Sequence, residues 1–297
     1  MTSQVRPLRV SVIGAGAVGT TLAVMFHRRG FPVVSVISRH LKSARRCARL
    51  VNCTQYSTSL KSLAADTSLL VIAVPDEQIR VVVQHLSLQA HLDFRRLEVF
   101  HTSGCLTSDE LQPLRRRGAL TFSLHPIQTF PRALSPELQL KLMKGISYGV
   151  EGTRWAIPFA KRLVRELGGN ILVVPKKEKI PYHLACVFAS NYPVVVLGAV
   201  EELVARFARP PRLRHFELLI ETSVGNALHH PPQKALTGPI ARGNLETVTA
   251  HLRTLRRRSS LWAVYRALGL YAVQLSRRAG RLTKKQERAL KEILSKA

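Results

Sequence analysis

The sequence predicts an α/β domain with a doubly wound, mainly parallel sheet, followed by an all-α domain. The first indication is the stretch 8–20, in which a short apolar run leads into a glycine-rich turn and then into a helix-prone segment. The second is the alternation of short apolar runs with helix-prone segments up to residue 174, which is typical of parallel strands joined by helices. The third is a change to long helices after Lys176. We therefore place the first domain at residues 1–176 and the second at residues 177–297.

The glycine-rich turn follows the apolar run Val10 to Ile13 directly and opens the helix-prone segment from Thr20 to Phe26. A G-x-G-x-x-G motif in this context is the fingerprint of a Rossmann dinucleotide-binding domain. The first glycine allows the tight turn, the second lets the backbone approach a pyrophosphate, and the third lets the helix pack closely on the strand. The N–H groups at the start of the helix then face the phosphates. The residues predicted to bind the cofactor here are Gly14, Ala15, Gly16, Ala17, Val18 and Gly19.

The second strand, Pro32 to Ile37, ends in Ser38-Arg39. An NAD site usually places an acidic residue near this point to bind the ribose 2′-hydroxyl, and this chain has none there. Ser38 can donate a hydrogen bond, and Arg39 can pair with a 2′-phosphate. The two residues therefore favour NADP as the cofactor. The alternative is that Arg39 is one surface arginine among many.

Further buried strands are expected at residues 68–74, 97–101, 120–124, 146–150 and 170–174. The carboxyl ends of the strands in such a sheet face the ligand crevice. We therefore expect Val74, Pro75 and Ser103, which lie at or just after strand ends, to contact the cofactor. His125 also follows a strand and is expected to contact the substrate, although with Pro126 it could instead only shape a turn.

The second domain begins with a nearly apolar helix at residues 179–206. A helix that is apolar on every side is buried, so we expect it at a domain or subunit interface, with a kink at Pro193. We expect no membrane span, because polar residues interrupt the apolar run 180–200. Further helices are expected near residues 213–228, 245–254 and 261–279, and a last one opens with the capping-box spacing of Thr283 and Gln286.

The net charge of +27 is unusual, and the first acidic residue is Asp66. A basic surface attracts anionic ligands and can bind nucleic acid without specificity. The basic residues are spread along the whole chain, and no basic run is interleaved with aromatic residues. We therefore interpret them as solvated faces, and anion or nucleic-acid binding remains an alternative.

The remaining composition indicates a reduced, globular protein without a metal. Apolar residues make up 46% of the chain, which excludes a disordered class. The four cysteines show no paired spacing, which favours a cytoplasmic location. The histidines show no metal-ligand spacing such as H-E-x-x-H, so we expect no metal.

Six motifs occur together: GAGAVGT at 14–20, VPD at 74–76, HTSG at 101–104, HPIQTF at 125–130, YHLACVFASNY at 182–192 and ALTGPIARGN at 235–244. In combination they resemble a family of predicted NADP-dependent oxidoreductases in which a Rossmann domain precedes a helical domain of unknown function. That family is similar to the 6-phosphogluconate dehydrogenase-like superfamily, which includes ketopantoate reductases, pyrroline-carboxylate reductases and prephenate dehydrogenases.

The resemblance implies hydride transfer from NADPH to the carbonyl of a small anionic oxo acid. Ketopantoate (2-dehydropantoate) is the candidate substrate, with a role in pantothenate biosynthesis. The resemblance also implies a homodimer formed through the helical domain. The chain departs from the family at one point: Arg242-Gly243-Asn244 stands where the pattern has an aspartate in third place, so that negative charge is missing.

Carbonyl reduction needs a group that protonates or polarises the substrate oxygen. Related superfamily members often use a lysine and an asparagine on the first helix of the helical domain. Here that helix carries His183, Ser190 and Asn191, and the last two lie about 20° and 80° from the first around the axis. We predict His183 as the general acid, since imidazole ordinarily titrates near neutral pH, and Asn191 as the group that holds the substrate. Ser190 is predicted to bind the substrate beside them.

Other interpretations of these residues remain. The three side chains could form a helix–helix hydrogen-bond network without chemistry. Lys179 is the competing acid, and its lysine-rich surroundings predict a solvent-exposed side chain. Thr237 and Arg242, in a Gly-Pro loop of the helical domain, are predicted to bind the substrate, the arginine by pairing with a carboxylate. For Arg242 an exposed ion pair is the alternative.

Two other functions stay open at this point. One is a regulatory or sensor module that binds NADP without turnover and would tolerate the loss of His183 and Asn191. The other is a basic protein that binds anions or nucleic acid, whose contacts would weaken steeply with added salt.

Overall fold

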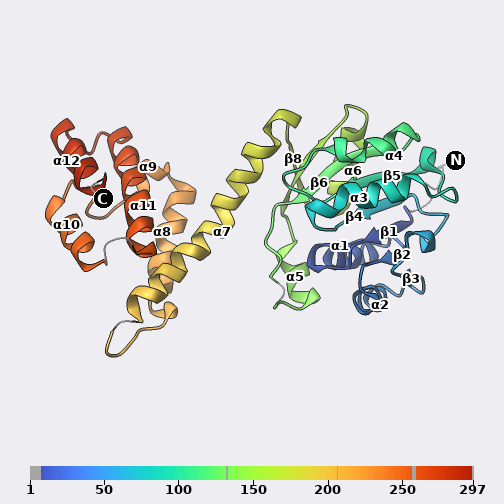
Figure 1. Cartoon of the computed structure of the whole chain (residues 1–297), viewed down its shortest axis with the longest axis horizontal. Helices are drawn as coiled ribbons and strands as arrows, with labels where there is room; N and C mark the ends of the chain where they lie inside the picture. The colour runs from blue at the N-terminus through green and yellow to red at the C-terminus, as the bar shows by residue number, and fades with distance from the viewer. Residues whose placement is uncertain (1–7, 132, 206, 256–258, 296–297) are drawn as a thin grey trace. The chain divides into compact units, whose positions relative to one another are not determined.

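The computed structural model describes residues 8–131, 133–205, 207–255 and 259–295 (Figure 1). The chain forms two compact units, Met1–Tyr192 and Pro193–Ala297. The division falls inside the long helix α7 (Lys179–Val204), later than the boundary predicted after residue 176. The reason is that the first turns of α7 pack on the sheet of the first unit, to which Lys179 is hydrogen-bonded.

The first unit contains an eight-stranded sheet with the order β3-β2-β1-β4-β5-β6-β7-β8. Among the described strands, β6 and β7 pair in antiparallel fashion and the other neighbours run parallel. The strands are β1 (Val10–Ile13), β2 (Val33–Ile37), β3 (Tyr56–Ser57), β4 (Leu69–Ile72), β5 (Glu98–His101), β6 (Leu120–Pro126), β7 (Ser147–Gly152) and β8 (Asn170–Val173). The predicted doubly wound, mainly parallel sheet is confirmed.

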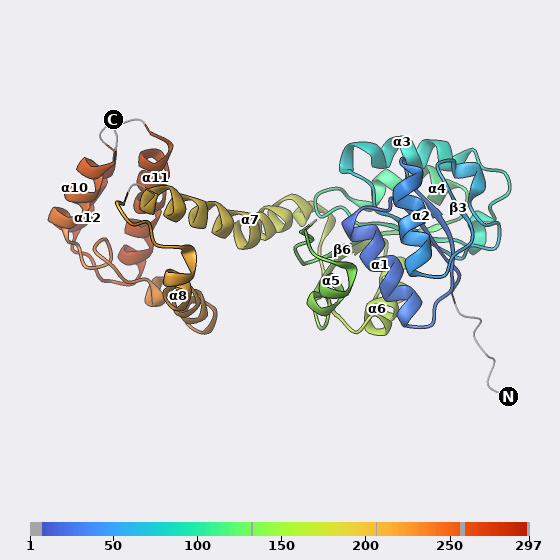
Figure 2. The ribbon, with the colours of Figure 1, turned by 90° about the horizontal axis from the view of Figure 1, so that it is seen from below.

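Helices cover both faces of this sheet (Figure 2). Side chains of a strand alternate between the faces, so Val10 and Val12 pack with α1, α2 and α6, whereas Ile13 packs with α3 and α4. The helices of the first unit are α1 (Ala17–Arg28), α2 (Leu41–Leu50), α3 (Asp76–Ser87), α4 (Gln112–Arg116), α5 (Pro136–Leu142) and α6 (Ala156–Glu166). Two apolar cores therefore hold the strand ends in fixed register.

The glycine turn between β1 and α1 has the geometry that its sequence predicts. Gly14 has φ +100°, and a Cβ there would lie 2.2 Å from the carbonyl oxygen of Ala73. A Cβ on Gly19 would lie 1.9 Å from the carbonyl oxygen of Gly14. At Gly16, in contrast, a Cβ would meet nothing within 4 Å. Two of the glycines thus serve the packing of the turn itself, and the third leaves open space beside it.

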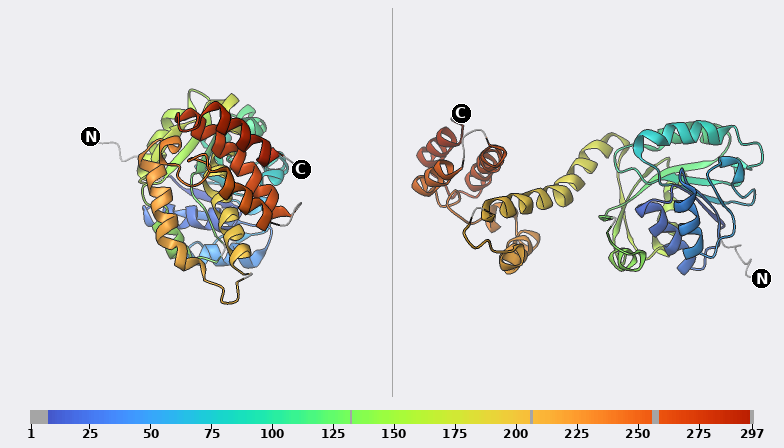
Figure 3. Two further views of the ribbon diagram at one scale, coloured as in Figure 1. Left: turned by 90° about the vertical axis from the view of Figure 1, so that its left-hand side faces the viewer. Right: turned by 60° about the horizontal axis from the view of Figure 1, so that its bottom comes forward.

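The regular secondary structure of the second unit is helical in its described residues, as predicted (Figure 3). After the end of α7 come α8 (Glu217–His229), α9 (Pro232–Ala235), α10 (Leu245–Thr254), α11 (Ser260–Arg278) and α12 (Lys284–Ser295). Its small core joins the last three helices and contains Val248, Val273, Leu282, Leu290 and Leu294.

The apolar helix α7, predicted to be buried at a domain or subunit interface, has exposed apolar side chains in its part of each unit. Ile180, Phe188 and Val194 on α7 are 60%, 61% and 68% exposed. By length and composition, residues 176–204 would also suffice to cross a membrane, contrary to the expectation from the polar residues in this run. Core helices of soluble proteins meet the same criteria, so length and composition do not by themselves indicate a span. The hydropathy of α7 indicates that its apolar surface is buried against something. It does not indicate whether the same chain, a second copy of the chain or a membrane buries it.

Candidate functional site

A cavity of about 1090 Å³ opens at the carboxyl ends of β1, β2 and β4. Gly14 to Ala17 of the glycine turn line it, together with Ile37 to His40 after β2 and Ala73 to Pro75 after β4. Helix α1 starts after Gly16 without a side-chain cap, so its first N–H groups are free to bind an anion. The cavity therefore lies where a dinucleotide binds in a fold of this kind.

One side of this cavity is basic and rich in hydroxyl groups. Among the described residues, none of those that line it is acidic. Arg39 lies at the end of β2, and its Nε is 3.3 Å from His40 Nε2. Ser38 Oγ accepts a long hydrogen bond from Ala15 N–H at 3.4 Å, which connects the end of β2 to the glycine turn. The other polar residues on this side are Ser43, Arg46, Thr58, Ser59 and Lys61.

No local sequence pattern marks Ser43, Arg46, Thr58, Ser59 and Lys61 as cofactor residues. Arg46 comes from α2 and Lys61 from a 3₁₀ turn, Leu60–Ser62, so they join Arg39 through tertiary structure alone. Of the predicted cofactor residues, the cavity is lined by Gly14, Ala15, Gly16, Ala17, Ser38, Arg39, Val74 and Pro75. The predicted residues outside its lining are Val18, Gly19 and Ser103.

A buried lysine lies at the start of α7. Contrary to the exposed surface position expected from its sequence context, Lys179 is 1% exposed. Its Nζ donates hydrogen bonds to the carbonyl oxygen of Ser103, at 3.2 Å, and to Ser123 Oγ, at 3.0 Å. Burial lowers the pKa of Lys179 to about 8, although nearby negative groups, Glu151 first among them, raise it. A lysine with this pKa can both hold and release a proton near neutral pH.

A histidine–tyrosine pair lies beside this lysine. The distance between His125 Nδ1 and Tyr182 Oη is 2.7 Å, and Lys179 Nζ is 5.6 Å from the centre of the tyrosine ring. Gly149 on β7 makes room for the pair, since a Cβ there would lie 2.1 Å from Tyr182 Oη. Burial lowers the pKa of His125 to about 4, so its ring is neutral at pH 7. Burial also raises the pKa of Tyr182, which keeps its proton.

His183 belongs to the same cluster. Its ring centre is 6.1 Å from that of His125. A Cβ on Gly104 would lie 2.6 Å from His183 Cδ2 and 3.0 Å from His125 Nε2, so the missing side chain lets both rings approach this loop. The structure thus brings two predicted residues, His125 and His183, to Lys179 and Tyr182.

Ser103 organises the loop after β5. Its Oγ donates to Asp76 Oδ2 at 2.8 Å and accepts from the N–H groups of Cys105 and Leu106 at 3.1 and 2.9 Å. Its own N–H donates to His101 Nδ1 at 3.2 Å. Burial lowers the pKa of His101 to about 4, so this nitrogen can accept. The loop is therefore held rigidly where its Ser103 carbonyl meets Lys179.

The other predicted site residues lie elsewhere. Asn191 is eight residues after His183, about 12 Å further along the helix at about 1.5 Å per residue. Ser190 Oγ donates to the carbonyl oxygen of Cys186 at 2.7 Å and also lies 2.9 Å from Asn191 Oδ1. Thr237 and Arg242 are exposed in the loop between α9 and α10 of the second unit. The roles assigned to these four residues stay predictions.

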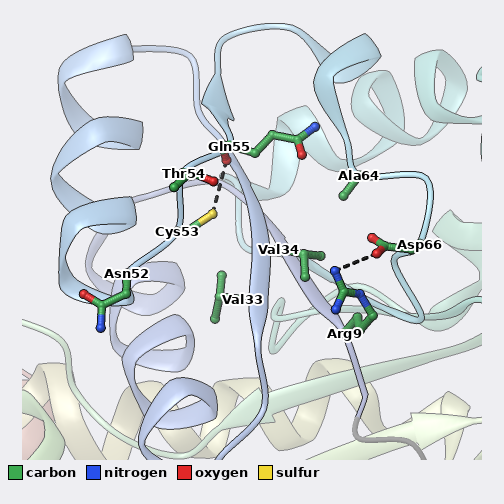
Figure 4. Close-up of a pocket in the computed structure, with 9 residues that line it drawn as sticks. All are labelled: Arg9, Val33, Val34, Asn52, Cys53, Thr54, Gln55, Ala64 and Asp66. Carbon is green, nitrogen blue, oxygen red and sulfur yellow. Dashed lines mark hydrogen bonds and ion pairs between the residues drawn. The ribbon is translucent and has the colours of Figure 1, made fainter.

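Figure 4 shows a smaller cavity of about 300 Å³, at the amino ends of the parallel strands. Its charged groups satisfy each other, because Arg9 pairs with Asp66 at 2.6 Å. Cys53 Sγ donates to the carbonyl oxygen of Gln55 at 3.3 Å, and burial raises the pKa of this thiol, which makes it unreactive. We assign no catalytic role to this cavity, since parallel strands place it at the edge opposite the glycine turn.

Comparison with known proteins agrees with this architecture. A Rossmann-like domain model matches residues 1–126, and the domain of unknown function DUF2520 matches residues 146–272. The chain thus carries a Rossmann-like domain followed by a match to this C-terminal domain of unknown function, the order that its sequence motifs predict. No curated protein matches the chain.

Solved structures share the fold over nearly the whole chain. A Bacteroides fragilis protein proposed to be an NADP oxidoreductase has a TM-score of 0.74 at 23% identity, covering 90% of this chain and 98% of that one. The Thermotoga maritima protein TM1727 has a TM-score of 0.69 at 23% identity, covering 91% and 99%. A reductive aminase from Aspergillus terreus, solved with NADPH, has a TM-score of 0.56 at 14% identity, covering 97% and 92%. At these identities the likeness establishes the fold.

Proposed function

We propose that this protein is an NADP-dependent oxidoreductase that reduces the carbonyl group of a small oxo acid. The observation that carries the proposal is Lys179, a buried amine with a lowered pKa at the same edge of the sheet as the dinucleotide cavity. Asp76 connects the dinucleotide cavity to Lys179. It follows Pro75, which lines the cavity, and it accepts a hydrogen bond from the Ser103 hydroxyl. The carbonyl oxygen of Ser103 in turn binds Lys179. The names of the solved relatives support the same class of activity.

In this proposal, separate groups of residues bind the cofactor and donate the proton. The glycine turn binds the pyrophosphate, and the basic side of the cavity binds the 2′-phosphate. NADPH supplies the hydride when it is bound. Lys179 has three N–H donors, and two of them are held by Ser103 and Ser123. The third is available for the substrate oxygen, which it polarises and protonates as the hydride arrives.

The neutral His125–Tyr182 pair supports this donor. Tyr182 occupies Nδ1 of the ring, so Nε2 is left to bind a second substrate atom near Gly104. Because its pKa is about 4, His125 adds no positive charge that would repel the ammonium group at neutral pH. His183 lies beside it and remains the alternative proton donor. Ketopantoate, named by the sequence resemblance, is the first substrate to test.

A panel of oxo acids that includes ketopantoate tests the proposal, with NADPH oxidation followed by absorbance. We expect turnover with at least one member. The rate of reduction should be constant between pH 6 and 7 and fall as the pH rises through about 8, because Lys179 must carry the proton that it donates. Tight NADPH binding without turnover across the panel would instead support the sensor interpretation.

Cofactor choice provides a separate prediction. Arg39→Asp removes a positive charge from the cavity and places a carboxylate where NAD enzymes have one. We expect NADPH affinity to fall on the order of 10- to 100-fold, the effect of one charge-assisted hydrogen bond, and the preference for NADPH over NADH to be lost. Arg45→Asp is the matched control, because Arg45 lies on α2 outside the cavity lining. Equal affinity of the unmodified protein for both cofactors, measured by titration, would contradict the prediction.

The exposed apolar residues of the second unit lead us to propose a homodimer. Leu218 and Leu228 on α8 are 76% and 78% exposed, as are large parts of α7. In the homodimer that we propose, a second copy of the chain buries these apolar surfaces. We expect a dimer in light scattering at micromolar concentration and without detergent.

Leu218→Asp should weaken this dimer by about 10-fold or more, because it introduces a charge into a buried apolar contact. Leu88→Asp is the control, since Leu88 is also 76% exposed but belongs to the first unit. A monomeric mass for the unmodified protein would refute the proposed dimer. A protein that stays in the membrane fraction would instead favour a membrane-bound α7.

A further inference from the structure

A buried carboxylate lies on the same face of the sheet as the Lys179 amine. Glu151 on β7 is 4% exposed and stands directly opposite Ser123 of β6 in the antiparallel register. Opposed residues of an antiparallel pair project to the same face of the sheet. Because Ser123 Oγ binds Lys179 Nζ at 3.0 Å, the Glu151 side chain points to the face that carries the ammonium group.

Two donors from one residue hold this carboxylate in place. The N–H of Ser108 donates to Glu151 Oε2 at 2.5 Å, and Ser108 Oγ donates to Oε1 at 3.0 Å. Within the described part of the chain, no arginine or lysine forms an ion pair with Glu151 at contact distance. A buried anion without a nearby positive charge is costly, so the charge of Lys179 across the Ser123 position is its natural compensation.

We propose that Glu151 is a positioning residue whose fixed negative charge keeps Lys179 protonated inside a site whose burial favours the neutral amine. Its part in catalysis rests on the proposed function, but the coupling of the two charges does not. In the reduction that we propose, the ammonium form is the proton donor, so loss of the carboxylate would leave less of the active form at neutral pH.

Among the charged groups that favour the ammonium form of Lys179, Glu151 has the largest effect. Asp76 also favours the ammonium form, but it is exposed at the start of α3 and is bound by the Ser103 hydroxyl. Cys105 and Cys186 act in the same direction, and each has a smaller effect than Glu151. Burial keeps His101 and His125 neutral near pH 7, and Tyr182 keeps its proton, so none of the three opposes the positive charge.

The coupling can be measured on the full-length protein without substrate. In protein labelled with ¹³C at lysine Cε, the Lys179 signal is identified by its loss in Lys179→Met and followed against pH. We expect Glu151→Gln, which keeps the shape and an acceptor for Ser108, to lower the titration midpoint of Lys179 by about one pH unit. Glu98→Gln is the control, since Glu98 stands on β5 of the same sheet at the opposite strand end, and it should leave the midpoint unchanged. An unchanged midpoint in folded Glu151→Gln would overturn the proposal.

Stability provides a second measurement that does not depend on the folding of Glu151→Gln. Between pH 4 and 7 the Lys179 amine is protonated in the folded chain, where its pKa is about 8, and in the unfolded chain, where it is 10.5, so its own titration contributes nothing in this range. Lys179→Met should therefore reduce the free energy of unfolding more at pH 7, where it leaves a buried carboxylate uncompensated, than at pH 4. An equal reduction at both pH values would also overturn the proposal.

A measurement of turnover against pH distinguishes a failure of the charge coupling from a failure of the proposed reductase function. With any oxo acid that the protein reduces, the pH at which turnover halves should move in Glu151→Gln by the same amount and in the same direction as the Lys179 signal. A shift of the signal without any turnover would support the charge coupling while refuting the reductase function. Turnover without a shift of the Lys179 signal would support the reductase function and refute the charge coupling.

Discussion

Lys179→Met should reduce turnover about 100- to 10,000-fold, the usual effect of losing a general acid, while NADPH binds as before. The substitution removes the N–H donors at Ser103 and Ser123 and the proton that the substrate oxygen needs. NADPH affinity should stay unchanged because Lys179 does not line the dinucleotide cavity. Steady-state kinetics on the reduced oxo acid and a separate NADPH titration measure the two effects independently.

The control for this experiment is Lys177→Met, two residues earlier in the chain at an exposed position. It removes the same charge from the same segment and should leave turnover unchanged. His183→Ala and Asn191→Ala test the catalytic roles predicted from sequence. If they abolish turnover while folded Lys179→Met keeps full activity, the proton donor is His183 and our assignment of Lys179 is wrong.

Gly16→Val should abolish NADPH binding without unfolding the protein. A Cβ at Gly16 meets nothing within 4 Å, so the new side chain extends into the space where the pyrophosphate approaches the backbone. The loss of two charge-assisted hydrogen bonds to phosphate corresponds to a fall in affinity on the order of 100-fold or more. Fluorescence titration with NADPH measures the affinity, and a thermal melt checks the fold.

The two neighbouring glycines provide the contrast. Gly14→Val places a Cβ 2.2 Å from the carbonyl oxygen of Ala73, and Gly19→Val places one 1.9 Å from the carbonyl oxygen of Gly14. Both substitutions should therefore destabilise or unfold the first unit. If Gly16→Val binds NADPH as tightly as the unmodified protein, the cavity at the glycine turn is not the dinucleotide site. The comparison separates a ligand role from a packing role within one motif.

Elements fixed by local pattern could be predicted from the sequence. The glycine turn requires a strand before it and a helix after it, and all three lie within 28 residues of the N-terminus, from Val10 to Arg28. The parallel strands could be predicted because buried strands form short continuous apolar runs. The position of Arg39 in the cavity lining could be predicted because the βαβ unit places it at a defined distance from the turn.

Interactions between distant segments could not be predicted in this way. Arg46 and Lys61 join Arg39 in one cavity through the packing of α2 and a short turn, and no local pattern marks them. The apolar α7 was expected to be buried, and hydropathy does indicate that its surface needs a cover. It does not indicate whether the same chain, a second copy or a membrane provides that cover.

The sequence by itself determined the fold class, the glycine turn and the position of the helix that carries the candidate catalytic groups, because these depend on residues close together in the chain. Only the tertiary structure decided the environment of Lys179. The residues just before it, Lys176 to Glu178, are charged and exposed, so local context predicts a solvated side chain. Its hydrogen-bond partners, Ser103 and Ser123, are 76 and 56 residues away, and they surround the amine because β5 and β6 end beside the start of α7. Burial lowers the pKa of that amine to about 8, and burial depends on contacts that no local sequence pattern encodes.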